Sequence, residues 1–282
     1  MSRTVFEAYN SIKSELEKAG FEDFVFEAKQ IIKHVTGFSN KEILNNYNEK
    51  LDEVAENTIT VFLRQRLIHY PLQYILGSWE FYGLKFLMGP GVLVPRADSE
   101  TVVDTALEFL KDKTNLCVLD LCAGSGCLGI SVAKNKSDCA VTMLEKYEEA
   151  ARYARKNCLI NKAINTRVVI GDVLKGDGKD MLYDLIISNP PYLTKDEMNN
   201  LQQEVTYEPQ TALDGGEDGL DFYRAIAENY KDALNSGGAL MFEIGYKQAQ
   251  AVKEIMTAAG YKNIEVKKDI ENRDRVIFGT VN

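Results

Sequence analysis

The sequence predicts an α/β protein with a seven-stranded, mostly parallel sheet containing one antiparallel strand, preceded by a small helical domain and a β-hairpin connector. Three observations lead to this fold class. Apolar residues recur at helical spacing from Thr4 to about Tyr70. Aromatic residues, β-branched residues and glycines are mixed between Pro71 and Arg96. Beyond Lys111, short apolar blocks alternate with helical stretches, which is typical of parallel strands covered on both faces.

The helical domain, residues 1–70, is expected to consist of several short helices separated by polar breaks. Ser39 or Asn40 is expected to cap a helix over KEILNNY, because both side chains accept hydrogen bonds from the free N–H groups of a first turn. A last, longer helix is expected to open at Leu51-Asp52 and to run through VFLRQRLIHY until Pro71 ends it.

The connector, residues 71–96, is expected to form a β-hairpin with a turn at Tyr82-Gly83 and a further turn at Gly89-Pro90-Gly91. After it, Asp98 or Ser99 is expected to cap a helix over TVVDTALEFLK, whose apolar positions repeat every three to four residues.

The third part, residues 97–282, is expected to form the sheet, in a Rossmann-like arrangement. The predicted strands are Cys117–Leu121, Ala140–Leu144, Arg167–Ile170, Asp184–Ser188, Ala239–Ile244, Ile264–Lys268 and Arg275–Gly279. The last two are joined by DIENRD, which is too short for a crossover helix, so they are predicted to pair antiparallel.

Composition narrows the function. The 282 residues carry a net charge of −9, which argues against a protein that binds the phosphate backbone of nucleic acid. The chain has no apolar run of membrane-spanning length and no signal-peptide pattern, so we expect a cytoplasmic protein without a membrane partner. The five cysteines form no Cys-x-x-Cys pair, and we expect reduced, small core side chains and no metal site.

A glycine loop follows the first strand of the sheet, in the segment DLCAGSGCLG at residues 120–129. Gly124, Gly126 and Gly129 satisfy the pattern G-x-G-x-x-G, and Glu145 ends the next strand about twenty residues later. The pattern fits a nicotinamide dinucleotide and S-adenosylmethionine alike. Asp120 favours the second, because a carboxylate repels a pyrophosphate and attracts an ammonium and a sulfonium. Asp120 accepting hydrogen bonds from loop amides is the alternative.

Two further acidic residues are expected at the same edge of the sheet. Glu145 is a candidate for gripping the two ribose hydroxyls, with an exposed strand-end carboxylate as the alternative. Asp172 is a candidate acceptor for the exocyclic amine of adenine, with Val173 against the ring. A simple cap of the following turn is nearly as good an explanation of Asp172.

The tetrapeptide Asn189-Pro190-Pro191-Tyr192 follows the fourth strand. Its prolines supply no N–H donors and fix the backbone, so the loop presents carbonyl oxygens in a rigid row. The Asn189 side-chain oxygen and the Pro190 carbonyl can accept both hydrogens of a planar –NH2 group, which directs electron density to its nitrogen, and Tyr192 can stack on a flat substrate. This predicts methyl transfer by in-line displacement, catalysed by alignment and electrostatics. An ordinary proline turn is the alternative.

These motifs together resemble those of the release-factor glutamine methyltransferases, the HemK/PrmC family, over nearly the whole chain. The resemblance is carried by Asn189-Pro190-Pro191-Tyr192, the DLCAGSG loop, Pro95-Arg96-Ala97-Asp98-Ser99-Glu100, Pro71-Leu72-Gln73-Tyr74-Ile75-Leu76-Gly77, Ala212-Leu213-Asp214-Gly215-Gly216, Asp218-Gly219-Leu220, Phe242-Glu243-Ile244-Gly245 and Asp274-Arg275. The departures are small. Ala97 and Ser99 stand where such proteins usually show Pro and Thr, and Cys122-Ala123 replaces the more usual Gly-Thr.

The resemblance implies a monomeric, S-adenosylmethionine-dependent enzyme that methylates the side-chain amide nitrogen (N5) of the glutamine in the Gly-Gly-Gln motif of peptide-chain release factors. It implies that the helical domain recognises the substrate and that residues 97–282 form the methyltransferase domain. The implied cofactor-binding residues are Cys122, Ala123, Gly124, Ser125, Gly126, Glu145, Asp172, Val173 and Asn189. The implied substrate-binding residues are Asn189, Pro190, Pro191 and Tyr192.

Three other functions compete with this one. An adenine-N6 methyltransferase of DNA or RNA would use the same acceptors, but it must flip a base and usually carries a basic surface, which the charge balance does not favour. A nicotinamide oxidoreductase is disfavoured by Asp120 and leaves the Asn189–Tyr192 motif unexplained. A non-catalytic binding module would not need a rigid acceptor loop beside a cofactor pocket.

Overall fold

The computed structural model describes residues 2–282, which fall into two compact units. The first extends to Gly77 and includes the distant segment Gln203–Tyr207, and the second comprises Ser78–Gln202 and Glu208–Asn282. The first unit includes Leu72–Leu76, because these residues fold into a short buried helix that packs on other helices of this unit. Among the described residues, no helix is both long and apolar enough to span a bilayer.

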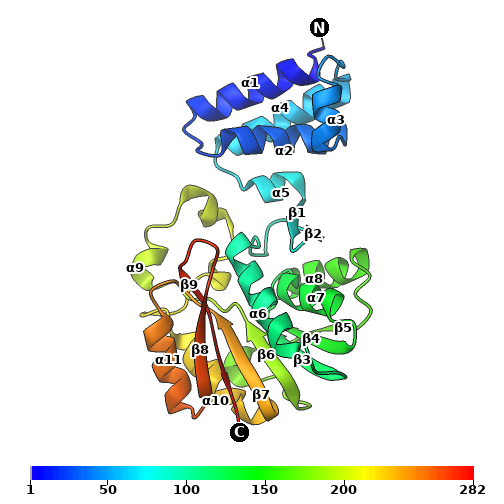
Figure 1. The fold of residues 1–282 in the computed structure, drawn as a ribbon. Coiled ribbons are helices and arrows are strands. Elements are labelled where there is room, and N and C mark those ends of the chain that lie inside the picture. Colours follow the sequence, from blue (N-terminus) through cyan, green and yellow to red (C-terminus); the bar gives the residue numbers. More distant parts are fainter. Residues whose placement is uncertain (1) are drawn as a thin grey trace. The chain divides into compact units, whose positions relative to one another are not determined.

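The first unit is helical (Figure 1). Its helices are α1 (Val5–Lys18), α2 (Phe24–Thr36), α3 (Asn40–Asn45), α4 (Glu53–Leu67) and α5 (Leu72–Leu76), and the segment Gln203–Tyr207 forms the 3-10 helix η3. Ser39 caps α3 in a capping box with Glu42, and Asp52 caps α4, which confirms both predicted starts. The prediction that the last helix continues to Pro71 is wrong, because His69 takes a positive φ of 62° and the helix ends at Leu67.

A buried ion pair joins α2 and α4 within this unit. Arg66 donates two hydrogen bonds to the Glu27 carboxylate, at 2.6 and 2.8 Å, and its guanidinium lies over the ring of Phe21. Arg66 also pairs with Glu204 at 2.7 Å, and the Tyr207 hydroxyl donates to the Ile68 carbonyl. These contacts attach the segment Gln203–Tyr207 to the helices.

The second unit opens with the predicted hairpin, formed by β1 (Ser78–Phe81) and β2 (Leu84–Leu87). Tyr82 and Gly83 link the strands with φ values of 51° and 68°. Positive φ at both central residues is the mark of the type I′ turn that suits a two-residue hairpin, so this turn is confirmed.

A seven-stranded sheet in the order β5-β4-β3-β6-β7-β9-β8 dominates the second unit (Figure 1). Its strands are β3 (Leu116–Leu121), β4 (Cys139–Glu145), β5 (Thr166–Ile170), β6 (Tyr183–Ser188), β7 (Leu234–Glu243), β8 (Lys262–Lys268) and β9 (Asp274–Thr280). Strand β9 lies between β7 and β8 and runs antiparallel to both, and the other pairings are parallel. The predicted fold class, with its seven strands and one reversed strand, is confirmed.

Helices cover both faces of this sheet. The α-helices are α6 (Glu100–Leu110), α7 (Cys127–Asn135), α8 (Glu148–Ile160), α9 (Lys195–Met198), α10 (Asp221–Asn229) and α11 (Ala249–Ala258). The 3-10 helices are η1 (Ala97–Ser99), η2 (Val173–Lys175), η4 (Gln210–Ala212) and η5 (Lys231–Ala233). Helices α6, α7 and α8 pack on one another in one layer, and α10 and α11 form the other.

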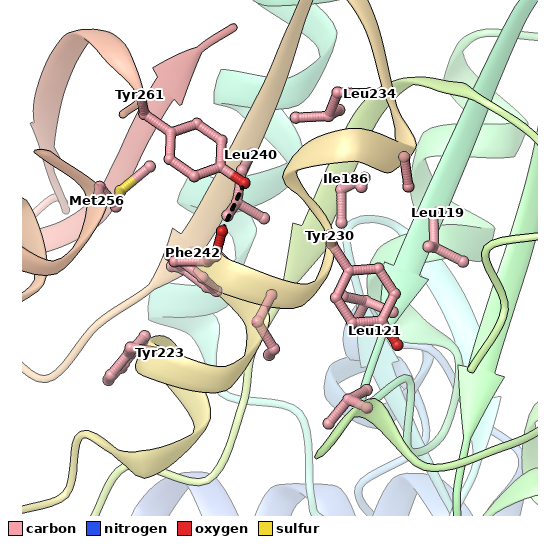
Figure 2. Close-up of a cluster of buried hydrophobic side chains, with 14 of the residues drawn as sticks. Leu119, Leu121, Ile186, Tyr223, Tyr230, Leu234, Leu240, Phe242, Met256 and Tyr261 are labelled. Carbon is pink, nitrogen blue, oxygen red and sulfur yellow. Dashed lines mark hydrogen bonds between the residues drawn. The ribbon is translucent and has the colours of Figure 1, made fainter. Parts of the chain in front are cut away.

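The alternation of side chains along β3 shows how the sheet divides these layers. Leu119 and Leu121 point into a buried cluster with Tyr223 of α10, Tyr230 at the C-cap of α10 and Met256 of α11 (Figure 2). The residue between the two leucines points the other way, because successive side chains of a strand alternate between faces. Asp120 therefore faces the α7 layer.

Helix α6 begins without the predicted cap. Ser99 occupies the N-cap position, but its side chain makes no capping hydrogen bond. Asp98 pairs with Arg275 of β9 at 2.9 Å. Asp98 bonds to Arg275, and Ser99 accepts from Asn189, so neither side chain bonds to the first turn. The prediction that Asp98 or Ser99 caps this helix is wrong.

The Arg66 ion pair leads to a stability prediction. Arg66→Met should lower the free energy of unfolding by about 3 kcal/mol, because it leaves the Glu27 carboxylate buried without a counter-charge. Lys18→Met removes an exposed ion pair in the same unit, with Glu15, and should change it by less than about 0.5 kcal/mol. Urea denaturation followed by far-UV circular dichroism measures both, and equal losses would contradict the assignment.

Candidate functional site

The glycine loop connects β3 to α7 through a backbone that only small residues accommodate well. Gly124 and Gly126 have φ values of 55° and 79°, and Cys122 has 57°. A Cβ at Gly126 would lie 3.0 Å from the Met143 sulfur, so this glycine lets the start of α7 approach β4. The loop is thus held close to the carboxyl ends of β3 and β4.

Glu145, the last residue of β4, fixes the loop from beneath. One carboxylate oxygen accepts from the Gly124 N–H and the other from the Tyr147 N–H, both at 2.8 Å. The residue is only 6% exposed, which rules out an exposed strand-end carboxylate. Burial raises its pKa, and the two backbone hydrogen bonds act against that rise.

Asp120 is buried beneath the loop with half of its carboxylate unpaired. Oδ2 accepts from the Gly129 N–H at 2.9 Å, while Oδ1 has no hydrogen-bond partner among residues 2–282. Burial raises the pKa of Asp120 to about 7, and the charge of Glu145 adds to the rise. A buried acceptor without a donor is costly, so its presence beside a cavity marks a place where a cationic donor can bind.

Asp172 caps the turn that follows β5, which is the alternative role that the sequence suggested for it. Its Oδ1 accepts from the Leu174 N–H, and its Oδ2 pairs with Lys146 at 3.0 Å. Burial tends to raise the pKa of Asp172, but the Lys146 and backbone hydrogen bonds outweigh it and the pKa is lowered. Asp172 is therefore ionised at neutral pH at the rim of the site.

The Asn189–Tyr192 loop begins directly after β6 and is clamped on its far side. Strand residue Ser188 donates to the Leu121 carbonyl at 2.8 Å, which ties the ends of β6 and β3 together. The Gln248 side chain donates to the Tyr192 carbonyl at 3.0 Å. A Cβ at Gly219 would lie 2.3 Å from this carbonyl oxygen.

A second clamp explains the segment Ala212–Gly216. Leu193 donates to the Leu213 carbonyl and accepts from the Gly215 N–H, both at 2.9 Å. A Cβ at Gly215 would lie 2.7 Å from the Tyr192 Cα, so only glycine allows this approach. The backbone of the Asn189–Tyr192 loop is thus held on two sides.

These loops surround a cavity of about 320 Å³, within the range of small-ligand sites. The predicted residues that line it are Asp120, Cys122, Ala123, Gly124, Ser125, Glu145, Asp172, Val173, Asn189 and Pro191. Gly126, Pro190 and Tyr192 do not line it. Gly126 acts as the N-cap of α7, and the Tyr192 ring packs at the edge of the hydrophobic cluster, where burial raises its pKa to about 12.

The cavity also has lining residues that were not among the predicted site residues. Tyr147 lies next to Glu145, and Phe222 and Thr211 come from segments far along the chain. Arg96 reaches the lining from the connector, where buried Glu208 pairs with it and accepts from the Val94 N–H. The Pro95-Arg96 motif was the available signal for Arg96, whereas Phe222 and Thr211 had none.

Comparison with known proteins agrees with this geometry. Residues 7–77 match the PrmC N-terminal domain and residues 86–219 the methyltransferase small domain. A release factor glutamine methyltransferase of Thermodesulfovibrio yellowstonii is 39% identical over 96% of this chain and 97% of its own. One of Fusobacterium nucleatum is 36% identical over 96% of this chain and 77% of its own. The chain belongs to the release factor glutamine methyltransferase family.

A solved structure supports the fold of the second unit. A methyltransferase from Pyrococcus furiosus superimposes with a TM-score of 0.53 at 24% identity, covering 71% of this chain and 90% of that one. As a member of the release factor glutamine methyltransferase family, the chain is an S-adenosylmethionine-dependent methyltransferase.

The cavity fits the charge of this cofactor. The unpaired Asp120 oxygen suits an ammonium group, and Glu145 and Asp172 add two carboxylates to the same lining. Among the described residues, no group of His, Cys, Asp and Glu side chains is arranged to hold a metal ion. The cysteines are all free thiols, and burial raises the pKa of Cys122 well above its ordinary value.

Asp120→Asn should change the pH dependence of stability. The unfolded carboxyl ionises near pH 4, whereas the folded one keeps its proton until about pH 7, so the wild-type protein loses stability as pH rises through this interval. The asparagine cannot ionise. The unfolding free energy of the variant relative to wild type should therefore rise by on the order of 3 kcal/mol between pH 4 and pH 8.

Urea denaturation of the apoprotein across this pH range measures the difference, and exposed Asp112→Asn is the matched control. The same Asp120→Asn variant should bind S-adenosylmethionine at least tenfold more weakly in calorimetry, because an amide replaces the carboxylate. A flat difference between the variant and wild type across pH would contradict the buried, protonatable Asp120.

Gly219→Ala should distort the acceptor loop, and Gly237→Ala is its matched control. Both glycines have a φ of 73°, but a Cβ at Gly237 meets nothing within 4 Å, whereas one at Gly219 meets the Tyr192 carbonyl. Gly219→Ala should lower kcat at least tenfold, and Gly237→Ala should show only the backbone cost of about 1 kcal/mol in stability. Equal kcat values for both variants would show that the clamp does not affect the loop.

Proposed function

We propose that this protein methylates the side-chain amide nitrogen (N5) of the glutamine in the Gly-Gly-Gln motif of peptide-chain release factors. The observation that carries the proposal is the position of Asn189. Its side chain lines the same cavity as the unpaired Asp120 carboxylate, on a loop whose backbone is clamped on two sides. An amide acceptor thus lies beside the place suited to a cationic methyl donor. The names of the relatives at 39% and 36% identity support the same substrate.

The proposed mechanism assigns the acceptor role to Asn189 and Pro190. The Asn189 side-chain oxygen and the Pro190 carbonyl each accept one hydrogen of the glutamine –NH2 group. This holds the amide planar, restores electron density to its nitrogen and aims it along the line of displacement. S-adenosylmethionine supplies the electrophilic methyl group. No general base is needed, because the methylated nitrogen loses its proton readily afterwards.

The proposed binding residues divide by the part of the ligand they recognise. Asp120 takes the ammonium group, Glu145 the ribose hydroxyls, and Asp172 with Val173 the adenine. The glycine loop, Cys122–Gly126, approaches the cofactor through its backbone, and Pro191 and Tyr192 complete the substrate loop. The burial of Tyr192 in the hydrophobic cluster favours a supporting role for its ring over stacking on the substrate.

The remaining assignments concern the domains and partners. We propose residues 1–70 as the substrate-recognition domain, 71–96 as the connector and 97–282 as the methyltransferase domain of a cytoplasmic monomer that binds no nucleic acid directly. The net charge of −9 supports a protein substrate over DNA or RNA, the substrates of the alternative adenine-N6 methyltransferase.

Asn189→Ala tests the mechanism. The variant should lose at least 100-fold in methyl transfer, because it removes one of two acceptors, while its affinity for S-adenosylmethionine in calorimetry stays within about threefold of wild type. Transfer is measured with radiolabelled S-adenosylmethionine and a release factor.

Two controls accompany this assay. A release factor whose Gly-Gly-Gln glutamine is replaced by alanine should take up no label, and duplex DNA should take up none. Label on DNA would establish the adenine methyltransferase instead. Turnover of Asn189→Ala equal to that of wild type would refute the acceptor role.

A further inference from the structure

Ser99 is a buried serine whose hydroxyl contacts the acceptor amide. It is 2% exposed and makes no hydrogen bond to the first turn of α6. The Asn189 side-chain Nδ2 donates to the Ser99 Oγ at 3.4 Å, and both side chains line the cavity. Ser99 is therefore the hydrogen-bond acceptor of the Asn189 side-chain –NH2 group.

Glu243 is a second buried residue, and its carboxyl group lies near the Ser99 hydroxyl. It is the last residue of β7, the strand next to β6, and it is 1% exposed. The Ser99 hydroxyl lies close enough to its carboxyl group to lower the carboxyl pKa, and Oε2 has no hydrogen-bond partner among the described residues. Burial raises the pKa of Glu243 to about 7, and the Ser99 hydrogen bond and the charge of Arg275 oppose the rise.

Arg275 is a fixed charge near Glu243. Its guanidinium is 9% exposed and is held by Asp98 at 2.9 Å, by Asp269 at 3.3 Å and by the Ile244 carbonyl at 3.3 Å. These bonds come from η1, from the turn before β9 and from the end of β7. Ser99 thus lies between Asn189 and a buried, charge-bearing cluster that does not line the cavity.

The arrangement has a consequence for the orientation of the amide. A serine hydroxyl has one hydrogen to donate, and the Glu243 carboxyl, with its unpaired Oε2, is the acceptor that lies near it. Its oxygen can then only accept from Asn189, which requires the –NH2 end of the amide to face Ser99. The two ends of an asparagine amide have nearly the same shape, so hydrogen-bond partners decide which way it points. With Nδ2 facing Ser99, Oδ1 is the end available to accept from a substrate.

We propose that Ser99 and Glu243 are positioning residues that set the direction of the Asn189 amide, so that its oxygen and not its –NH2 group faces the substrate. The inference rests on the proposed function, in which this oxygen accepts a hydrogen of the glutamine amide. A reversed Asn189 would place two –NH2 groups against each other and leave the substrate without its acceptor. Neither Ser99 nor Glu243 contacts the reacting atoms.

Replacement of Ser99 separates this role from a contact with the cofactor. Ser99→Ala removes the acceptor and should lower kcat at least tenfold, while the affinity for S-adenosylmethionine in calorimetry stays within twofold of wild type. Ser99→Thr keeps the hydroxyl and should restore kcat to within about threefold of wild type. Ser131→Ala is the matched control, because it deletes the hydroxyl of another buried serine, one whose Oγ has no partner among the described residues, and should leave kcat unchanged.

A second measurement needs no substrate. The Asn189 side-chain –NH2 group is observed by ¹⁵N–¹H correlation spectroscopy and identified by the peak that Asn189→Ala removes. Its exchange with water should be at least tenfold faster in Ser99→Ala than in wild type or Ser99→Thr. This arm tests the orientation even if the release factor proves not to be the substrate, which the wild-type assay reveals separately.

Three results would overturn the proposal. They are a Ser99→Ala enzyme with wild-type kcat, equal losses in Ser99→Ala and Ser99→Thr, and unchanged exchange of the Asn189 –NH2 group. A loss of cofactor affinity matching the loss of kcat would likewise overturn it, since it would make Ser99 a cofactor ligand.

Discussion

The register of β3 against its two parallel neighbours is the constraint on which the site depends. Leu121 pairs with Leu144 of β4 on one side and with Ser188 of β6 on the other. Glu145 and Asn189 are the next residues along those strands, so the ribose candidate and the amide acceptor flank the glycine loop at one edge of the sheet. A slip of one residue in either pairing would turn the paired strand's side chains to opposite faces. The hydrogen bond from Ser188 to the Leu121 carbonyl reinforces this register.

Three buried carboxyl groups lie in or near the site. Asp120, Glu145 and Glu243 are each 6% exposed or less, and burial raises the pKa of all three. Burying a carboxylate with an oxygen left unpaired costs stability, as at Asp120 and Glu243. Such a cost is understandable where the group acts on a ligand or orients a neighbour. The acidity of the chain thus includes buried carboxyl groups, two of which line the cavity, and a net charge alone does not reveal them.

Local patterns sufficed to predict much of this molecule. Apolar blocks predicted all seven strands. The short link between the last two strands predicted their antiparallel pairing, and Tyr82-Gly83 predicted the hairpin turn. Most of the site residues that the motifs predicted line the cavity. The failed cap of α6 depended on partners distant in sequence. Ser99 has the residue type of a helix cap, but its hydroxyl accepts a hydrogen bond from Asn189, ninety positions away. Phe222 and Thr211 belong to no local pattern, and only the tertiary fold brings them to the cavity.

The chain between the Asn189–Tyr192 loop and Gly215 passes through both units. Between the acceptor loop and the clamp at Gly215, the chain leaves the second unit, and Gln203–Tyr207 become part of the helical one. There Glu204 pairs with Arg66, and Tyr207 bonds to Ile68. The helical unit is therefore not attached by a single linker. The segment between Leu193 and Gly215 therefore has its middle in the helical unit and its two ends in the sheet unit, where Leu193 and Gly215 bond to each other.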